Sequence, residues 1–243
     1  MDGQFITFEG GEGAGKSTQI ARLKAHLEAA GLTVCVTREP GGSPGAETIR
    51  ELLLSGAAQK LGPRGEALLF AAARADHVDS LIAPALARGE WVLCDRFADS
   101  TRVYQGEAGV KGNILDMLET IAVAGQRPDL TILIDVPAET GLARVNTRVA
   151  SLSSDGPDRF EGEELAVHER RRMLFLDLAR REPARFVVID GRQSAEKVEA
   201  DIWLAVRQHF SDLLAGQSDT GGGAAGPGAG GAQSSGKTHA AKA

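Results

Sequence analysis

The sequence predicts an α/β fold in which a five-stranded parallel sheet is covered by helices on both faces. Two observations lead to this prediction. Five short apolar runs of strand-like composition alternate along the chain with segments of helical periodicity. A glycine-rich phosphate-binding pattern also lies between the first apolar run and the first helical segment, which is the context it requires. The predicted strands are Phe5–Glu9, Leu32–Val36, Trp91–Asp95, Leu130–Val136 and Arg185–Asp190.

The segments between these strands carry apolar residues at helical spacing. In the first segment these residues run from Ile20 to Leu27, and Gly31 supplies the residue type that closes a helix. Pro84 predicts a kink in the longest helix, whereas Pro137 suits the first turn of the helix that it opens. The helices predicted after the first are Ala46–Leu54, Glu66–Ala87, Asn113–Gly125, Pro137–Val149, Glu163–Glu182 and Ser194–Leu214.

One domain is predicted over residues 1–214, because no Pro-, Gly- or Ser-rich linker divides that part of the 243-residue chain. The end of the sequence differs sharply in composition. Residues 216–243 hold 9 Gly and 7 Ala and no aromatic or branched aliphatic residue, so apolar burial cannot offset the entropy of ordering them. We therefore expect a Gly/Ala-rich disordered tail over residues 215–243.

The charge and composition exclude several classes of function. A net charge of −6 argues against a nucleic-acid binder or a membrane-surface binder, since either normally carries a basic excess. The sequence shows no basic-plus-apolar leader and no apolar run of membrane length, which predicts a cytoplasmic protein. Cys35 and Cys94 lie in strand-like runs without a C-x-x-C pattern, so we expect buried, reduced thiols.

The phosphate-binding pattern G-x-x-x-x-G-K-[ST] is complete between the first strand and the first helix. Its glycines let backbone N–H groups turn toward a phosphate, and the start of the helix adds the positive end of a dipole. Lys16 adds a full positive charge, and the Ser17 hydroxyl can reach Mg²⁺. The sequence therefore predicts a nucleotide site formed by Gly10, Gly11, Glu12, Gly13, Ala14, Gly15, Lys16, Ser17 and Thr18.

Three of the predicted strands carry an aspartate at or next to their last position that could face Mg²⁺, namely Asp95, Asp135 and Asp190. Spacing does not choose among them. Asp95 is favoured because Arg96 follows it directly and the segment Asp99–Gly106 is dense in polar side chains. We interpret that segment as a loop that holds the phosphate acceptor.

Two further positions have both a functional and a purely structural interpretation. Arg38 lies in a Pro- and Gly-rich turn after the second strand, so it either faces a phosphate or is a surface arginine. Phe70 and Arg74 share a helix face at i and i+4. Together they could stack on a nucleobase and donate to its carbonyl, but the pattern alone favours a core Phe beside a surface Arg.

Arginines are unusually frequent where a phosphate acceptor would need them. Transfer between two polyanions requires positive charge from several directions, whereas a water or hydroxyl acceptor requires a base and fewer arginines. Residues 149–160 form a polar segment flanked by arginines, which is typical of a lid that closes over phosphates, although an ordinary helix-to-helix loop has the same composition. The candidate cations beyond Lys16 are Arg38, Arg96, Arg144, Arg148 and Arg159.

These residues together resemble the bacterial thymidylate kinases, P-loop nucleoside monophosphate kinases that phosphorylate dTMP to dTDP with ATP. The similarity covers about residues 3 to 212 and includes several motifs in family order. They are Phe8–Thr18, Thr37–Gly42, Leu69-Phe70 with Ala73-Arg74, Asp95-Arg96, Ser100-Thr101, Tyr104–Gly106, Arg127–Thr131 and Asp158–Glu161. The resemblance implies the three-layer P-loop kinase fold, ATP as co-substrate, Mg²⁺ and a homodimer.

The resemblance also implies roles for individual residues. Phe70 would stack on thymine, Arg74 would donate to its O4, and Thr101 would meet the Watson–Crick edge. Tyr104 would lie against the deoxyribose, where a 2′-hydroxyl would clash. Arg96 would hold the acceptor phosphate. The implied substrate-binding residues are Arg38, Phe70, Arg74, Arg96, Ser100, Thr101, Tyr104 and Gln105.

On the donor side, the resemblance implies that Asp95 and Ser17 organise Mg²⁺ and that Arg148 lies by the adenine. Glu12 would face the sugar and phosphate of the acceptor. Because the phosphate loop contains no arginine, the lid would supply the catalytic one, and Arg159 is the choice over Arg144 and Arg148. The implied catalytic residues are Lys16, Glu12, Arg96 and Arg159.

Two other functions compete with this hypothesis. A deoxynucleoside kinase would use the same phosphate loop with a hydroxyl acceptor. A regulatory protein would bind ATP without turnover, which the intact Lys16 and the arginines near the predicted acceptor segment argue against.

Overall fold

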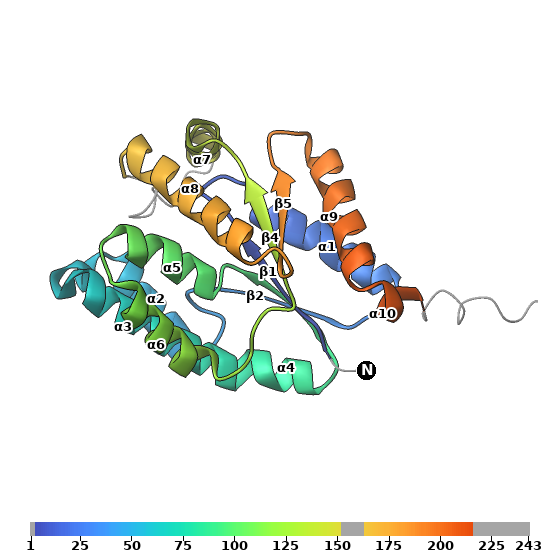
Figure 1. Cartoon of the computed structure of the whole chain (residues 1–243), viewed down its shortest axis with the longest axis horizontal. Coiled ribbons are helices and arrows are strands. Elements are labelled where there is room, and N and C mark those ends of the chain that lie inside the picture. Colours follow the sequence, from blue (N-terminus) through green and yellow to red (C-terminus); the bar gives the residue numbers. More distant parts are fainter. Residues whose placement is uncertain (1–2, 152–162, 216–243) are drawn as a thin grey trace, which may run out of the picture.

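A computed structural model describes residues 3–151 and 163–215, and these form a parallel five-stranded sheet with helices on both faces (Figure 1). The order across the sheet is β2-β3-β1-β4-β5. The predicted fold class is therefore confirmed. The strands are β1 (Phe5–Glu9), β2 (Val34–Arg38), β3 (Trp91–Asp95), β4 (Leu130–Asp135) and β5 (Phe186–Asp190).

The helices follow the alternation that the sequence predicts. Because all strands are parallel, the chain must return from the end of each strand to the opposite edge of the sheet before the next strand begins. Most of these connections contain helices. The α-helices are α1 (Lys16–Ala29), α2 (Pro44–Leu54), α3 (Gly62–His77), α4 (Ala83–Ala87), α5 (Ala98–Glu107), α6 (Gly112–Val123), α7 (Ala138–Ser151), α8 (Leu165–Arg181), α9 (Ala195–His209) and α10 (Ser211–Ala215). Two short turns, η1 (Ala57–Leu61, 3₁₀) and η2 (Val78–Ile82, π), complete the set in the described residues.

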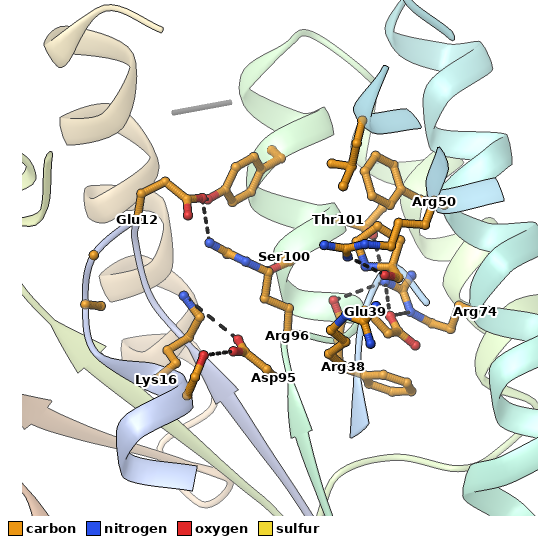
Figure 2. A pocket seen from close by; sticks show the side chains of 18 of the residues that line it. Glu12, Lys16, Arg38, Glu39, Arg50, Arg74, Asp95, Arg96, Ser100 and Thr101 are labelled. Atoms are coloured by element: carbon orange, nitrogen blue, oxygen red, sulfur yellow. Dashed lines mark hydrogen bonds and ion pairs between the residues drawn. The ribbon is translucent and has the colours of Figure 1, made fainter. Parts of the chain in front are cut away.

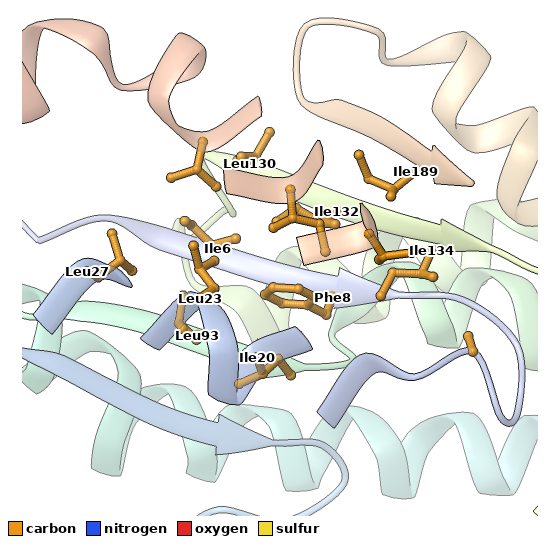
Figure 3. Packing of buried hydrophobic residues seen from close by; sticks show 14 of the residues in the cluster. Ile6, Phe8, Ile20, Leu23, Leu27, Leu93, Leu130, Ile132, Ile134 and Ile189 are labelled. Carbon is orange, nitrogen blue, oxygen red and sulfur yellow. The ribbon is translucent and has the colours of Figure 1, made fainter. Parts of the chain in front are cut away.

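The sheet buries a different set of side chains on each face, as the alternation of a strand requires. Ile6 and Phe8 of β1 pack with α1 and α9, and Figure 3 shows this cluster between the ribbons. Phe5 of the same strand points to the other face, where it packs with η2 and α4. Strand β1 is therefore buried on both faces and fixes where the loop that follows it emerges.

The long helix after β2 differs in detail from the prediction. It begins at Gly62, earlier than the predicted Glu66, because Pro63 occupies the first turn, where its missing N–H costs nothing. Near Pro84 the α-helical pattern is interrupted by η2, in which bonding widens to a π turn. A proline cannot donate to the carbonyl one turn earlier, so the irregular turn lies just before it.

The segment Asp99–Gly106, which we expected to be a loop, is instead part of helix α5. Its polar residues have modest helix propensity, but tertiary contacts hold them in place. Asp99 is buried and receives two hydrogen bonds from Arg185, at 2.7 and 3.0 Å. The polar side chains predicted to face an acceptor therefore project from a rigid helix.

At its C-terminal end the chain breaks the predicted helix Ser194–Leu214 into α9 and α10 at Phe210, whose ring packs edge-on against Trp91. Residues 216–243, which contain nearly all of the predicted tail, lie outside the described residues. Helix α7 continues to Ser151, and the rest of the predicted lid also lies outside them.

The expectation of buried thiols is confirmed for Cys94 but not for Cys35. Cys94 is buried and Cys35 is half-buried, and both are free thiols. Burial raises the pKa of each thiol. Among residues 3–151 and 163–215, no helix combines the length and the apolar character that a membrane span requires.

Helix α7 contacts the loop after β1 where Gly141 of the helix lies against Gly13 of the loop. A substitution at this contact tests how closely the two segments pack. A Cβ on Gly141 would lie 2.2 Å from the carbonyl oxygen of Glu12, so the helix and the loop could not keep their present separation. We expect Gly141→Ala to lower the melting temperature by about 5 °C in thermal unfolding, despite the better helix propensity of Ala.

Gly112→Ala is the matched control, because it adds the same methyl group to a helix where a Cβ would meet nothing within 4 Å. Its melting temperature should be unchanged or slightly raised. Equal effects of the two substitutions would contradict the close packing of α7 on the loop.

Candidate active site

A cavity of about 360 Å³ opens at the carboxyl ends of β1, β2 and β3. This is the edge where parallel α/β sheets bind ligands. Most of the site residues expected from the sequence line it, together with several that sequence reasoning did not select. The lining residues are Glu12, Gly13, Ala14, Gly15, Lys16, Ser17, Thr18, Arg38, Glu39, Pro40, Arg50, Leu54, Phe70, Arg74, Asp95, Arg96, Phe97, Ser100, Thr101, Tyr104 and Gln105.

The phosphate loop is shaped by glycines with positive φ and leads directly into α1. Gly10, Gly13 and Gly15 have φ values of 138°, 66° and 93°, which strain any residue with a Cβ. No side chain caps the start of α1, and its first turn contains no acidic residue. The backbone N–H groups at this helix start therefore remain available to an anion.

Lys16 lies beneath the loop with its ammonium group among oxygen acceptors. Nζ donates to the carbonyl oxygens of Gly10 and Gly11, at 3.3 and 3.2 Å, and lies 4.0 Å from Oδ1 of Asp95. Burial and the nearby charge of Arg96 lower the pKa of Lys16. The carbonyl contacts are weak enough for a phosphate oxygen to replace them.

Of the three strand-end carboxylates, Asp95 has the environment of a metal ligand. Its Oδ2 accepts from the Ser17 hydroxyl at 3.0 Å, whereas Oδ1 is buried and has no hydrogen-bond partner in the described residues. Asp135 is paired with Arg172 at 2.6 Å, and Asp190 with Arg192 at 2.8 Å. An unsatisfied carboxylate oxygen beside a hydroxyl fits Mg²⁺, which prefers oxygen ligands.

No group of three or more His, Cys, Asp or Glu side chains suited to a metal occurs in the part of the chain that the structure describes. Mg²⁺ at Ser17 and Asp95 would therefore take its other ligands from the nucleotide phosphates and water, as is usual for this ion.

Glu12, Arg96 and Tyr104 form a compact cluster beside the phosphate loop. Figure 2 shows Glu12 and Arg96 facing each other there. Arg96 Nη2 and the Tyr104 hydroxyl both donate to Oε1 of Glu12, at 2.6 and 2.7 Å. Burial alone would raise the pKa of Glu12, but the charges of Arg96 and Lys16 lower it to about 2. The carboxylate is therefore ionised near neutral pH and holds Arg96 in the cavity.

The backbone of Arg96 has a φ of 69°, in the left-handed region that non-glycine residues rarely adopt. The buried carboxylate of Glu9 stabilises this turn by accepting from the Phe97 N–H at 2.8 Å and from the Ser100 hydroxyl at 2.7 Å. Ser100 in turn accepts from Arg96 Nη1 at 3.2 Å. Sequence reasoning did not select Glu9, although a carboxylate at the end of an apolar strand is itself a signal.

The opposite wall of the cavity is also cationic. Arg38 lines it, with half of its side chain exposed and an ion pair to Glu47 at 3.0 Å. Arg50 on α2 lines it as well and donates to the Pro40 carbonyl at 2.6 Å. Arg50 was missed because its place in an amphipathic helix looks like an ordinary surface position. Figure 2 shows both arginines across the cavity from Glu12.

Phe70 and Arg74 lie deeper in the cavity wall, and the interpretation of Arg74 as a surface residue is wrong. Phe70 lines the cavity and is also packed against the buried cluster around Tyr104 and Phe175. Arg74 is buried and not a surface residue. Its Nη2 donates to Oγ1 of Thr101 at 3.0 Å. Gln105 is buried and lines the cavity as well.

Of the three arginines expected at the lid, the structure places the side chain of Arg144 alone. Arg144 donates to the carbonyl of Gly191 at 3.1 Å and does not line the cavity. The side chain of Arg148 and the whole of Arg159 lie outside the described residues. Their assignments remain predictions.

Comparison with known proteins identifies the family. A family model described as thymidylate kinase matches residues 8–202. The chain is 56% identical over 209 residues to a protein named thymidylate kinase from Rhodopseudomonas palustris, with 85% of this chain and 90% of the relative covered. It is 54% identical over 208 residues to one from Nitrobacter hamburgensis, with 85% and 89% covered.

The chain belongs to the thymidylate kinase family. The resemblance noted in the sequence is thereby confirmed, and it applies to the domain that carries the cavity. The matched region begins in β1, before the phosphate loop, and ends within α9.

The buried carboxylate of Glu9 gives this thymidylate kinase family member a testable pH dependence. Burial and the charge of Asp99 raise the pKa of Glu9 from 4.5 to about 7. The folded state therefore binds a proton more tightly than the unfolded state. Stability is highest below the unfolded value and falls as the pH rises through the folded one, by on the order of 3 kcal/mol in total.

We expect denaturant unfolding of the native sequence to show a smaller free energy at about pH 8 than at about pH 5.5. Glu9→Gln should remove most of this difference, because the amide does not titrate. An equal pH dependence in both proteins would assign the effect to other groups.

Proposed function

We propose that this protein transfers the γ-phosphoryl group of ATP to dTMP, giving dTDP and ADP. The observation that supports this most directly is the convergence of cations from separate elements on one cavity. Lys16 comes from the phosphate loop, Arg38 from β2, Arg50 from α2 and Arg96 from the turn after β3. Two phosphorylated substrates that meet end to end require this distribution of charge.

The donor side of the proposal rests on the phosphate loop. The free N–H groups at the start of α1 and the ammonium of Lys16 would bind the β- and γ-phosphates of ATP. Ser17 and Asp95 would hold Mg²⁺, which would neutralise charge on the transferred phosphoryl group. Arg148 would lie by the adenine, and Arg159 would add the lid cation.

The acceptor side rests on the residues across the cavity. Arg96, Arg38 and Arg50 would bind the phosphate of dTMP and orient one of its oxygens toward the γ-phosphorus. Glu12 keeps Arg96 directed into the cavity, and no carboxylate base is needed, because a phosphate oxygen is already ionised at neutral pH. Charge placement is therefore the main catalytic device.

The base and sugar of the acceptor would occupy the deeper part of the cavity. Phe70 would stack on thymine, while Arg74 and Thr101 would face its polar edge. Tyr104, fixed by its bond to Glu12, would lie against C2′ and leave no room for a 2′-hydroxyl. Ser100 and Gln105 complete this wall.

An acceptor panel tests the proposal and separates it from its rivals. With ATP and Mg²⁺, we expect ADP release in a coupled assay with dTMP, and far less with thymidine, dCMP or dGMP. Faster turnover of thymidine would indicate a deoxynucleoside kinase. Tight ATP binding in calorimetry without turnover of any acceptor would indicate a regulatory protein.

Lys16→Ala tests the role of the Lys16 ammonium in phosphoryl transfer. Removing the ammonium should lower kcat by about a thousandfold or more, since one electrostatic contact to the transferred group contributes that much. Circular dichroism should show an unchanged fold. Near-normal turnover would remove Lys16 from the catalytic group.

We further propose that the protein forms a homodimer. It would act in the cytoplasm, where its partners are free nucleotides. Support for the dimer comes from α3 and α6, which pack together on one side of the sheet (Figure 1). Both helices expose apolar side chains. Leu68 of α3 is 54% exposed, and Met117 and Ile121 of α6 are 60% and 69% exposed. Apolar groups gathered in this way are typical of an interface between subunits.

Light scattering on the purified protein should give twice the monomer mass. Ile121→Glu should shift the protein toward the monomer, because a carboxylate would be buried without a partner. Leu204→Glu is the matched control, since Leu204 is 54% exposed on α9, across the sheet from α3 and α6. A monomer mass for the native sequence would refute the dimer.

A further inference from the structure

The guanidinium of Arg74 is fixed in the cavity wall by hydrogen bonds to three other residues. Its Nε donates to Oε2 of Glu39 at 2.8 Å. Its Nη2 donates to Thr101 Oγ1 at 3.0 Å and to the Phe97 carbonyl at 3.1 Å. None of the hydrogen bonds recorded among residues 3–151 and 163–215 involves Nη1. Because Arg74 lines the cavity, Nη1 is the guanidinium nitrogen that these contacts leave for a ligand.

The carboxylate that orients Arg74 is itself oriented by a histidine. Glu39 uses Oε2 for Arg74, and its Oε1 lies 3.1 Å from Nδ1 of His77. Because a carboxylate only accepts, Nδ1 carries the proton of this bond. His77 is 0% exposed and reaches neither the cavity nor solvent.

The second ring nitrogen of His77 is also used. Nε2 lies 2.7 Å from Oγ1 of Thr37, at the end of β2. The backbone of Gly42 fills the remaining space, since a Cβ there would lie 2.5 Å from Nε2. The ring is thus fixed at both ends, and a chain of hydrogen bonds runs from Thr37 through His77 and Glu39 to Arg74. Figure 2 shows its last part, where Glu39 meets Arg74 beside Thr101.

We propose that His77 is a positioning residue that acts through Glu39 to aim the Nη1 donors of Arg74 at the acceptor base. The inference rests on the proposed dTMP kinase function and deepens it. A guanidinium nitrogen can only donate hydrogen bonds. If Nη1 is held in one orientation, it can bond a carbonyl oxygen on the acceptor base but not an amino group at the same position. By fixing the orientation of Arg74, His77 would increase the selectivity for a base that carries a carbonyl.

Two amide substitutions of His77 test the proposal, because each can replace a different ring nitrogen. In His77→Asn the amide nitrogen can take the place of Nδ1 and keep the bond to Glu39. In His77→Gln the amide extends toward the position of Nε2 and Thr37, so the bond to Glu39 is lost. We expect His77→Gln to raise the KM for dTMP by about tenfold and to lower the preference for dTMP over dCMP.

The same variant should leave the KM for ATP within about twofold, because the donor site does not touch this chain of hydrogen bonds. His77→Asn should raise the KM for dTMP by less than about threefold. His26→Gln, at a histidine on α1 far from the cavity, is the control for the amide substitution and should change neither constant.

Equal effects of His77→Gln and His77→Asn, or equal rises in both KM values, would overturn the proposal in favour of a general role in folding. If neither His77 variant folds, Thr37→Val frees Nε2 without touching Glu39, and an unchanged KM for dTMP would overturn it as well. The assay of the native sequence comes first. No phosphorylation of dTMP there would refute the proposed function, whereas activity with normal His77 variants would refute only this inference.

Discussion

The structure depends on holding positive charges close together around one cavity, where five cationic side chains share the lining with three carboxylates. Two like charges repel by about 4 kcal/mol at roughly 4 Å and an intermediate dielectric, so neighbouring cations need counter-charges. Buried carboxylates relieve this repulsion without filling the cavity. Glu12 holds Arg96 through Oε1, and Glu39 holds Arg74 through Oε2. Each cation is thereby fixed in place before a phosphate or base arrives.

The same carboxylates link the site to the sheet. Glu9 ends β1 and accepts from the turn that carries Arg96, while Glu39 follows β2 and meets α3 through Arg74 and His77. The donor and acceptor walls are therefore attached to β1 and β2, and both of these strands pair in parallel with β3, which lies between them. Because the side chains of the site are already in position, little of the substrates' binding energy is needed to arrange them. More of that energy can stabilise the transition state.

The elements that sequence reasoning placed well are those whose signals are local. The phosphate loop, the five strands and the pairing of Phe70 with Arg74 on one helix face all depend on residues within one turn or one strand. The polar segment after Arg96 was misjudged as a loop. Its helix is stabilised by contacts such as Arg185 with Asp99, which join residues far apart in the chain.

Other parts of the site could not be found from the chain alone. Arg50 and His77 occupy unremarkable positions in amphipathic helices, and only packing shows that one lines the cavity and the other lies buried behind it. Among the strand-end carboxylates, the contacts of Asp135 and Asp190 with Arg172 and Arg192 leave Asp95 as the one beside Ser17.

The sequence by itself determined the alternation of strands and helices, the phosphate loop and the family, because periodicity, glycine placement and motif order are properties of neighbouring residues. Tertiary structure decided which arginines share a cavity and which carboxylates hold them. Those choices depend on distances between separate elements, and such distances exist only once the sheet has set its strand order.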